Sequence, residues 1–313
     1  MESILITGAT GMIGSALTEL LLKEGYAVIG LTRDPGKQVS RHPHLRYAGW
    51  DPQKGRIDDW AISEADHVIN LAGASVAEGR WTNKRKQVIL QSRVQSGHTL
   101  TQVLAKVPNK VRTVLQASAI GWYGADSKRN GFHAFKEDAP ADSHFLGSTC
   151  QQWEESIAGV RDLGKRLVYF RIGIVLSNRG GAYREFLKPV TFGIAPVLGS
   201  GRQIYSWIHI TDLCYMFLYA IRNKELNGVF NAVTPHPISN RELILGIARQ
   251  RNSWRYISVP VPSWVLQGML GEMSIEVLKS ATVSGEKIMR SGFVFTHPEI
   301  HEAIRSLITD PTQ

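Results

Sequence analysis

The chain has 313 residues, of which 43% are hydrophobic and 20% charged, an ordinary composition for a globular protein. Its formal net charge is +9, but the basic residues are scattered and form no zinc-finger, RNP or basic-helix pattern, so no nucleic-acid partner is expected. No apolar run reaches the roughly 20 residues that span a bilayer, so no membrane partner is expected either. The start of the chain lacks the pattern of a secretion signal, and Cys150 and Cys214 lie far apart without a metal-ligand cluster. We therefore expect a cytoplasmic protein with two free thiols rather than a disulfide, and no metal.

The first half alternates short β-branched runs with longer helical stretches. Strands are predicted over residues 2–7, 27–32, 67–71, 113–118 and 167–172, and helices over residues 15–24, 83–107 and 147–164. This alternation predicts an α/β, doubly wound parallel-sheet Rossmann fold.

The pattern becomes less regular after about residue 173. Further strands are predicted over 205–209 and 292–296, and helices near 211–222 and from residue 239. We therefore expect a Rossmann domain over 1–175, with later segments returning to its sheet, and a smaller C-terminal lobe over 176–313.

A glycine-rich loop follows the first predicted strand at once. Gly8, Gly11 and Gly14 stand in a Gly-x-x-Gly-x-x-Gly pattern between that strand and a leucine-rich helix. This pattern suits a tight turn, close approach of the backbone to a pyrophosphate, and close packing of helix on strand. The helix N-terminus then offers free N–H groups to phosphates. The residues predicted to contact a dinucleotide here are Gly8, Thr10, Gly11, Met12 and Ile13.

The second predicted strand ends in Thr32-Arg33-Asp34. An arginine at this place suits the 2′-phosphate of NADP, whereas an acid suits the free ribose hydroxyl of NAD. We predict NADP through Thr32 and Arg33. A register shift of one residue would make Asp34 an NAD-type acid, so the sequence leaves NAD open.

Several further short sequence motifs follow the glycine loop along the chain. They are Gly49-Trp50-Asp51-Pro52, Asn70-Leu71-Ala72-Gly73, Ser92-Arg93, Trp153-Glu154-Glu155, Arg171-x-Gly173-x-Val175-Leu176 and Trp207-Ile208-His209-Ile210-x-Asp212. With them the whole chain resembles the extended short-chain dehydrogenase/reductases. It is most similar to an atypical subgroup of NAD(P)-dependent epimerase/dehydratase-like proteins, the "epimerase family protein" group, which carries a small extra C-terminal domain, here over residues 260–310.

The resemblance implies further cofactor contacts. It places Leu71, Ala72 and Gly73 along the adenosine and ribose, and Asp51 near the adenine. Arg93 then looks like a cofactor-contacting residue, and Leu176 lies near the nicotinamide. Arg93 as an exposed helix residue and Leu176 as plain core remain alternatives. The resemblance also suggests a homodimer.

The catalytic pattern of that superfamily is missing. Its working members pair a tyrosine with a lysine four residues later, so that the tyrosine relays a proton while hydride moves at the nicotinamide. Here Leu146 and Cys150 fall at the two positions. Ser118 resembles the superfamily's substrate-holding serine, and Tyr123 is the candidate for a replacement phenol, with a structural tyrosine as the alternative.

Two other groups of residues are candidates for the site. His209 and Asp212 precede a helix, and a helix entry is the alternative to an acid/base couple. Among the tryptophans, Trp81 and Trp207 are expected to face a cleft, with core packing as the alternative. Together these observations predict an NADP(H)-dependent oxidoreductase or epimerase acting on an unknown small molecule. The alternative is a catalytically weak or inactive NADP(H)-binding sensor.

Overall fold

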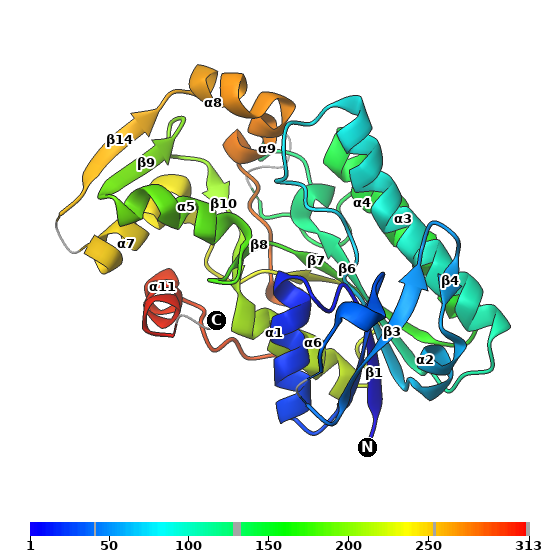
Figure 1. Cartoon of the computed structure of the whole chain (residues 1–313). Helices are drawn as coiled ribbons and strands as arrows, with labels where there is room; N and C mark the ends of the chain where they lie inside the picture. Colours follow the sequence, from blue (N-terminus) through cyan, green and yellow to red (C-terminus); the bar gives the residue numbers. More distant parts are fainter. Residues whose placement is uncertain (41, 128–132, 253–254, 311–313) are drawn as a thin grey trace.

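The computed structural model describes residues 1–40, 42–127, 133–252 and 255–310. Its main feature is an eight-stranded sheet with the order β12-β7-β6-β5-β1-β2-β3-β4 (Figure 1). All neighbouring strands are parallel except β4, which runs antiparallel to β3. The strands are β1 (Ser3–Thr7), β2 (Ala27–Thr32), β3 (Leu45–Asp51), β4 (Arg56–Ile57), β5 (His67–Asn70), β6 (Thr113–Ala119), β7 (Arg166–Ile172) and β12 (Gly228–Ala232).

The strand order reverses beside β1. The chain builds outward from β1 through β2 and β3, then returns to the other side of β1 for β5, β6 and β7. In a doubly wound sheet, ligands bind beyond the carboxyl ends of the strands at such a reversal. The loops after β1 and β5 lie at this reversal, so the topology predicts a ligand site between them.

Helices cover both faces of the sheet. One face carries α1 (Met12–Lys23) and α6 (Ile210–Arg222), and the other carries α2 (Asp59–Glu64), α3 (Asn83–Lys106) and α4 (Phe145–Ile157). Two apolar clusters fill the two interfaces, one containing Leu17 and Phe217 and the other containing Ile62 and Leu100. The fold is therefore the predicted three-layer α/β Rossmann fold.

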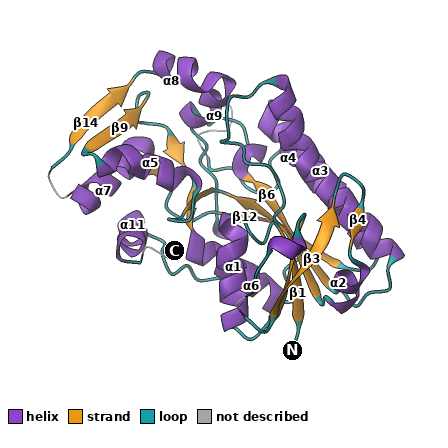
Figure 2. Cartoon of the chain, in the orientation of Figure 1, coloured by secondary structure: helices purple, strands orange, loops and turns teal. Residues whose placement is uncertain are grey.

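A third apolar cluster is built from residues between Leu176 and Leu307. Figure 2 shows the small pair of strands β9 and β14 at a distance from the main sheet, with α5 and α7 beside it. The elements of this part are β8 (Ile174–Leu176), α5 (Gly181–Thr191), β9 (Ile194–Leu198), β10 (Ile204–Tyr205), β11 (Trp207–His209), β13 (Ile238–Ser239), α7 (Asn240–Asn252), β14 (Ile257–Val261) and α11 (Ile300–Thr309).

Short helices link this part to the rest of the molecule. They are α8 (Ser263–Leu270), α9 (Ser274–Leu278) and α10 (Glu286–Arg290), with 3-10 turns elsewhere, including η1 (Pro35–Lys37) and η4 (Ala158–Arg161). Lys86 on α3 pairs with Glu272, and Arg80 donates a hydrogen bond to the carbonyl of Gly268. No helix in the described part of the chain has the length and apolar character needed to cross a membrane.

The five strands predicted in the first half are all present within one residue at each end. The prediction of one helix over 147–164 is wrong at both ends, because α4 starts at Phe145 and its last turns tighten into η4. Residues 292–296 were predicted as a strand, but they form turns and irregular chain, with Phe293 and Phe295 packed in the α1–α6 cluster. Strands β3 and β12 were missed.

Candidate functional site

The glycine loop joins β1 to α1 and is shaped by close contacts. Gly8 has φ +68°, and a Cβ there would lie 3.2 Å from the backbone of Leu71. A Cβ on Gly14 would lie 2.1 Å from the carbonyl oxygen of Gly8, which no other residue could tolerate without moving the loop. The Gly11 N–H donates to that same carbonyl at 3.0 Å. The glycines therefore hold the loop tightly against both α1 and the segment after β5.

The N-terminus of α1 has room for an anion. Among the described residues no side chain caps it and no acid lies in its first turn. The first N–H groups of a helix have no partner within the helix, so those of Met12 and Ile13 point out of its end. Thr10 and Gly11 are exposed beside them. Free N–H groups and the positive end of the helix dipole together favour a phosphate.

A buried polar network fixes the neighbouring segment. The Thr7 hydroxyl donates to the Asn70 side-chain oxygen at 2.6 Å and accepts from the N–H groups of Leu71 and Ala72, both at 3.0 Å. The Ser96 hydroxyl on α3 donates to the same Asn70 oxygen at 2.6 Å. The loops after β1 and β5 are thus locked together, which the glycine pattern alone did not predict.

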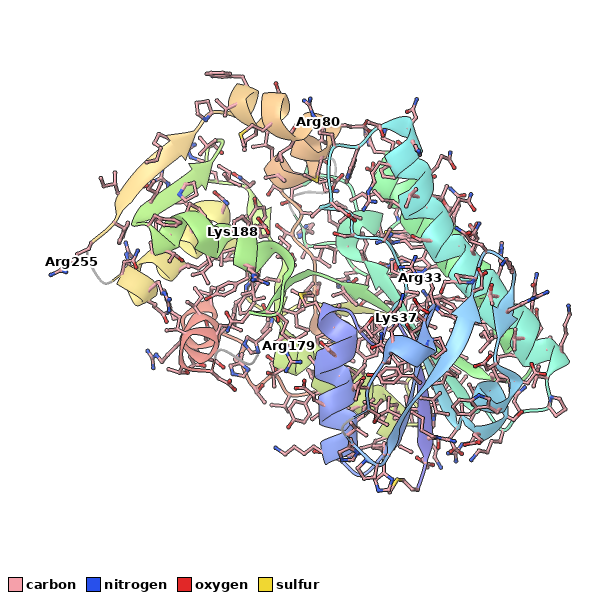
Figure 3. The ribbon with its side chains drawn as sticks, in the orientation of Figure 1. Arg33, Lys37, Arg80, Arg179, Lys188 and Arg255 are labelled. Atoms are coloured by element: carbon pink, nitrogen blue, oxygen red, sulfur yellow. The ribbon has the colours of Figure 1, made fainter. Side chains whose placement is uncertain are left out.

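The end of β2 carries the predicted 2′-phosphate residues. Arg33 is exposed, and its neighbour Asp34 is held by Lys37 across the η1 turn at 2.6 Å (Figure 3). The Thr32 hydroxyl accepts from the N–H of Asp34 at 3.3 Å. Sequence reasoning missed Lys37, although its spacing from Asp34 is that of an i,i+3 ion pair. The one acid near Arg33 in sequence is therefore already paired with a cation.

Asp51 is the last residue of β3 and lies in a different setting. A pocket of about 540 Å³ includes Asp51 and Arg33 among its walls, together with the last turn of α3. In the part of the chain that the structure describes, neither the glycine loop nor the segment after β5 lines this pocket. The Asp51 side chain accepts the N–H of Gln53 at 3.0 Å, so part of its role is to form that turn.

Arg93 lies against the segment after β5. One of its guanidinium nitrogens donates to the carbonyl oxygens of Ala74 and Ile89, both at 2.9 Å, and its charge lies 4.9 Å from the Trp153 ring centre. A Cβ on the exposed Gly73 would lie 3.0 Å from the Arg93 guanidinium carbon. Burial lowers the pKa of Arg93, and no carboxylate pairs with it among the described residues. Arg93 is therefore not an ordinary exposed helix residue.

Leu176, at the end of β8, has a fully buried side chain in the third apolar cluster. Its Cα is paired with that of His209 on β11. Any contact of Leu176 with a ligand is therefore limited to its main chain.

Ser118 and Tyr123, the two predicted catalytic residues, are enclosed by the protein. Both are buried, and the Ser118 hydroxyl donates to a Glu154 carboxylate oxygen at 2.7 Å. The Tyr123 hydroxyl donates to the Asn231 side-chain oxygen at 2.7 Å and accepts from Arg171 at 3.1 Å. Burial raises the pKa of Tyr123 to about 12. Both hydroxyls are therefore engaged inside the protein, and a catalytic role for either residue stays a prediction.

The network around Tyr123 centres on one buried ion pair. Arg171 and Glu154 meet through two hydrogen bonds of 2.9 and 3.0 Å, and the Arg171 guanidinium lies 3.5 Å from the centre of the Trp122 ring. The pair ties β7 to α4 below the predicted catalytic position. The two residues of this internal pair are 17 positions apart in the sequence, so the motifs that contain them do not by themselves indicate the contact.

The positions of the missing tyrosine and lysine also hold no replacement. Leu146 is apolar, and Cys150 is buried with its thiol 3.6 Å from the Ala119 carbonyl. Burial raises the pKa of the Cys150 thiol to about 12, so it stays protonated at neutral pH. Gly121 packs against both side chains, so a larger residue at position 146 or 150 would require a rearrangement around Gly121.

The remaining candidates are part of the core or of a helix entry. The His209 Nδ1 accepts the N–H of Thr211 and so caps α6, and its ring stacks on His297 at 4.1 Å. The expected exposure of Trp81 and Trp207 to a cleft is wrong. Trp207 is fully buried and Trp81 is nearly so, since both rings pack among apolar neighbours. Both indole N–H groups donate to backbone carbonyls.

The fold and motifs match known proteins over the full chain. The model of the NAD dependent epimerase/dehydratase family matches residues 4–146, and that of a domain of unknown function, DUF1731, matches residues 261–307. Epimerase family protein YfhF of Bacillus subtilis is 34% identical over 98% of both chains, and epimerase family protein SSP1921 of Staphylococcus saprophyticus is 37% identical over 98% of this chain and 100% of its own. The chain belongs to the epimerase family.

This epimerase-family chain also resembles solved structures. The human epimerase family protein SDR39U1, solved with NADPH, matches with a TM-score of 0.85 and 27% identity over 98% of this chain and 99% of its own. The match extends over the small C-terminal part as well as the Rossmann sheet. The resemblance to the atypical short-chain dehydrogenase/reductases is thereby confirmed.

Proposed function

We propose that this epimerase-family chain binds NADP(H) in preference to NAD(H). The observation that carries the proposal is the arrangement after β2, where Lys37 pairs with Asp34 while Arg33 is exposed next to it. A paired Asp34 is a poor acceptor for a free ribose hydroxyl, and two cations beside each other favour a 2′-phosphate. The NADPH present in the human relative's structure supports the same choice.

The residues at the sheet reversal fit a dinucleotide. The N–H groups of Met12 and Ile13 would hold the pyrophosphate, and Leu71 to Gly73 would line the adenosine and ribose, as the positions of these segments allow. Arg93, which lies against Gly73 without a carboxylate partner in the described chain, would contact the same ligand. When bound, the cofactor would supply hydride exchange at its nicotinamide.

For the reaction, we propose an oxidoreductase or epimerase acting on a small molecule without the usual tyrosine–lysine relay. Ser118, Tyr123 and Cys150 are all buried or engaged, so the proton would come from water or from the substrate itself. A second candidate is an NADP(H) sensor with little chemistry. The same closed catalytic position favours it.

The cofactor proposal is tested by titrating NADPH and NADH while following tryptophan fluorescence. Loss of a charge-assisted contact in Arg33→Ala should raise the Kd for NADPH roughly tenfold to a hundredfold and leave that for NADH unchanged. Lys23→Ala removes an exposed cation from the opposite end of α1 and should change neither. Equal affinity of the wild-type protein for both cofactors would overturn the proposal.

The two candidate reactions are separated by turnover. A panel of carbonyl compounds is screened for NADPH oxidation, and a panel of nucleotide sugars is screened by product analysis, because epimerisation regenerates its cofactor. Substrate-dependent conversion supports the enzyme. Tight NADPH binding with no conversion across both panels supports the sensor.

A further inference from the structure

The small sheet of β9 and β14 has one apolar face on which Ile194, Ile257 and Val259 are exposed. In the parallel pair, Ile257 lies beside Ile194, and side chains of paired residues share a face. The residues on this face are all apolar: Ile194, Pro196, Leu198, Ile257, Val259 and Val261. On the opposite face Ala195 and Val197 of β9 are buried, whereas Ser258 and Pro260 of β14 are exposed.

Large apolar side chains extend this face at both ends. Phe192 precedes β9 and is 83% exposed, and Ile257 is 72% exposed. Beyond β14, Trp264 and Met269 on α8 are 73% and 67% exposed. We call these residues, with the six on the sheet, the lobe face. Single exposed hydrophobic residues are common, but several large ones on successive elements indicate an interaction surface.

Basic residues border the lobe face. Arg255 comes two residues before Ile257, and Arg241 packs on Gly201 beyond the end of β9. Arg80 reaches the carbonyl of Gly268 next to Met269. Figure 3 shows Arg255 at the far end of β14 and Arg80 beside α8. These three arginines place positive charge at the border.

We propose that the lobe face binds the surface of an anionic lipid bilayer. Exposed tryptophan, phenylalanine and isoleucine side chains can enter the boundary between headgroups and acyl chains, while flanking arginines attract acidic headgroups. The proposal is independent of the cofactor and of any reaction.

A second copy of the chain fits this face less well. A two-fold contact would bring the same basic borders of the two copies together, and like charges placed opposite each other destabilise a contact. Extension of the sheet through the open edge of β14 is hindered, because Ile257 and Val261 bond towards β9 and the outward Pro260 has no N–H.

The test uses the full chain and sedimentation with vesicles. One set of vesicles is phosphatidylcholine, and the other is an equal mixture of phosphatidylcholine and phosphatidylglycerol. The protein should bind the mixed vesicles and not the neutral ones. Trp264→Glu and Arg255→Glu should each weaken binding by about tenfold or more, since each removes an anchor or reverses a charge. Val294→Glu, at an 80% exposed residue outside the lobe face, is the matched control.

Each other result overturns the proposal. Absence of binding to the mixed vesicles does so directly, and equal losses in Trp264→Glu and Val294→Glu show that the lobe face is not the contact. A dimer by light scattering that Trp264→Glu dissociates, without vesicle binding, assigns the face to a second copy. NADPH titration of every variant verifies that the Rossmann part is folded, so a failed cofactor proposal is recognised separately by the wild-type titration.

Discussion

The ends of β1 and β2 differ sharply from the end of β6 in how their polar groups are used. At β1 and β2 the N–H groups of Met12 and Ile13 and the Arg33 side chain face outward, and the glycines hold them in place. At β6 the hydroxyls of Ser118 and Tyr123 are closed into an internal network with Glu154.

A binding site and a polar core within one Rossmann fold therefore differ in whether their polar groups already have partners in the protein. A ligand site needs positioned polar groups that still lack a partner, because the ligand supplies it. A polar group satisfied by the protein stabilises the fold but offers nothing to a substrate. Substitutions in the open region should therefore change cofactor binding, whereas substitutions in the closed region should change stability.

The largest expected effect comes from breaking the closed network. Arg171→Met leaves Glu154 as a buried, uncompensated carboxylate and should lower the free energy of unfolding by about 3–5 kcal/mol. Urea denaturation measures this loss. The double variant Arg171→Met, Glu154→Leu removes both charges and should lose less than the single variant. NADPH affinity of the folded fraction should stay unchanged, and a large affinity loss with normal stability would make the pair part of the site.

In the open region, two glycines should behave differently. In Gly14→Ala the new Cβ meets the Gly8 carbonyl at 2.1 Å, so the loop must move, which should cost about 1–3 kcal/mol of stability and abolish NADPH binding. In Gly11→Ala the nearest atom is the Gly8 carbonyl oxygen at 3.3 Å, a tight contact that needs a much smaller shift, so stability should fall less than in Gly14→Ala while the added methyl obstructs a pyrophosphate. Thermal unfolding and NADPH titration separate the two effects. Normal NADPH affinity in both variants would show that the loop does not hold the cofactor.

His209, which caps α6, is buried in its neutral form. Burial, with the neighbouring His297 charge, lowers the pKa of His209 to about 4, and Asp212 opposes this shift. Because the unfolded chain takes up the proton first, this contribution to stability is present above pH 6.5 and is lost as the pH falls towards 4. Wild-type protein should lose about 2 kcal/mol between pH 7 and pH 5 through this group.

The His209→Asn variant supplies the control, since asparagine can still accept the Thr211 N–H without titrating. Urea unfolding at the two pH values should show a smaller loss in this variant than in the wild-type protein. The same loss in both proteins would place the acid sensitivity elsewhere.

The sequence could predict the open region because the signals for it are local. The glycine spacing, the strand before it and Arg33 after β2 all lie within about 30 residues. The closed region depends on contacts that no local pattern encodes. Tyr123 meets Arg171 across 48 residues and Asn231 across 108. Likewise, Trp207 looked like a ligand-facing residue until its burial among residues of α5, α7 and α11 was known.

The smallest effect comes from the residue on which the comparison depends most. Tyr123→Phe removes one hydroxyl from the closed network but leaves Arg171 its bonds to Glu154 and to the Glu137 carbonyl. A lost internal hydrogen bond should cost about 1 kcal/mol in urea denaturation, and any turnover found in the substrate panels should persist within about twofold.

Tyr123→Phe also removes a phenol whose pKa is raised to about 12 by burial. The wild-type protein should therefore lose stability as the pH rises from 10 towards 12, and the variant should lose less. Loss of turnover at unchanged stability would return Tyr123 to the catalytic site and make the end of β6 an open region as well.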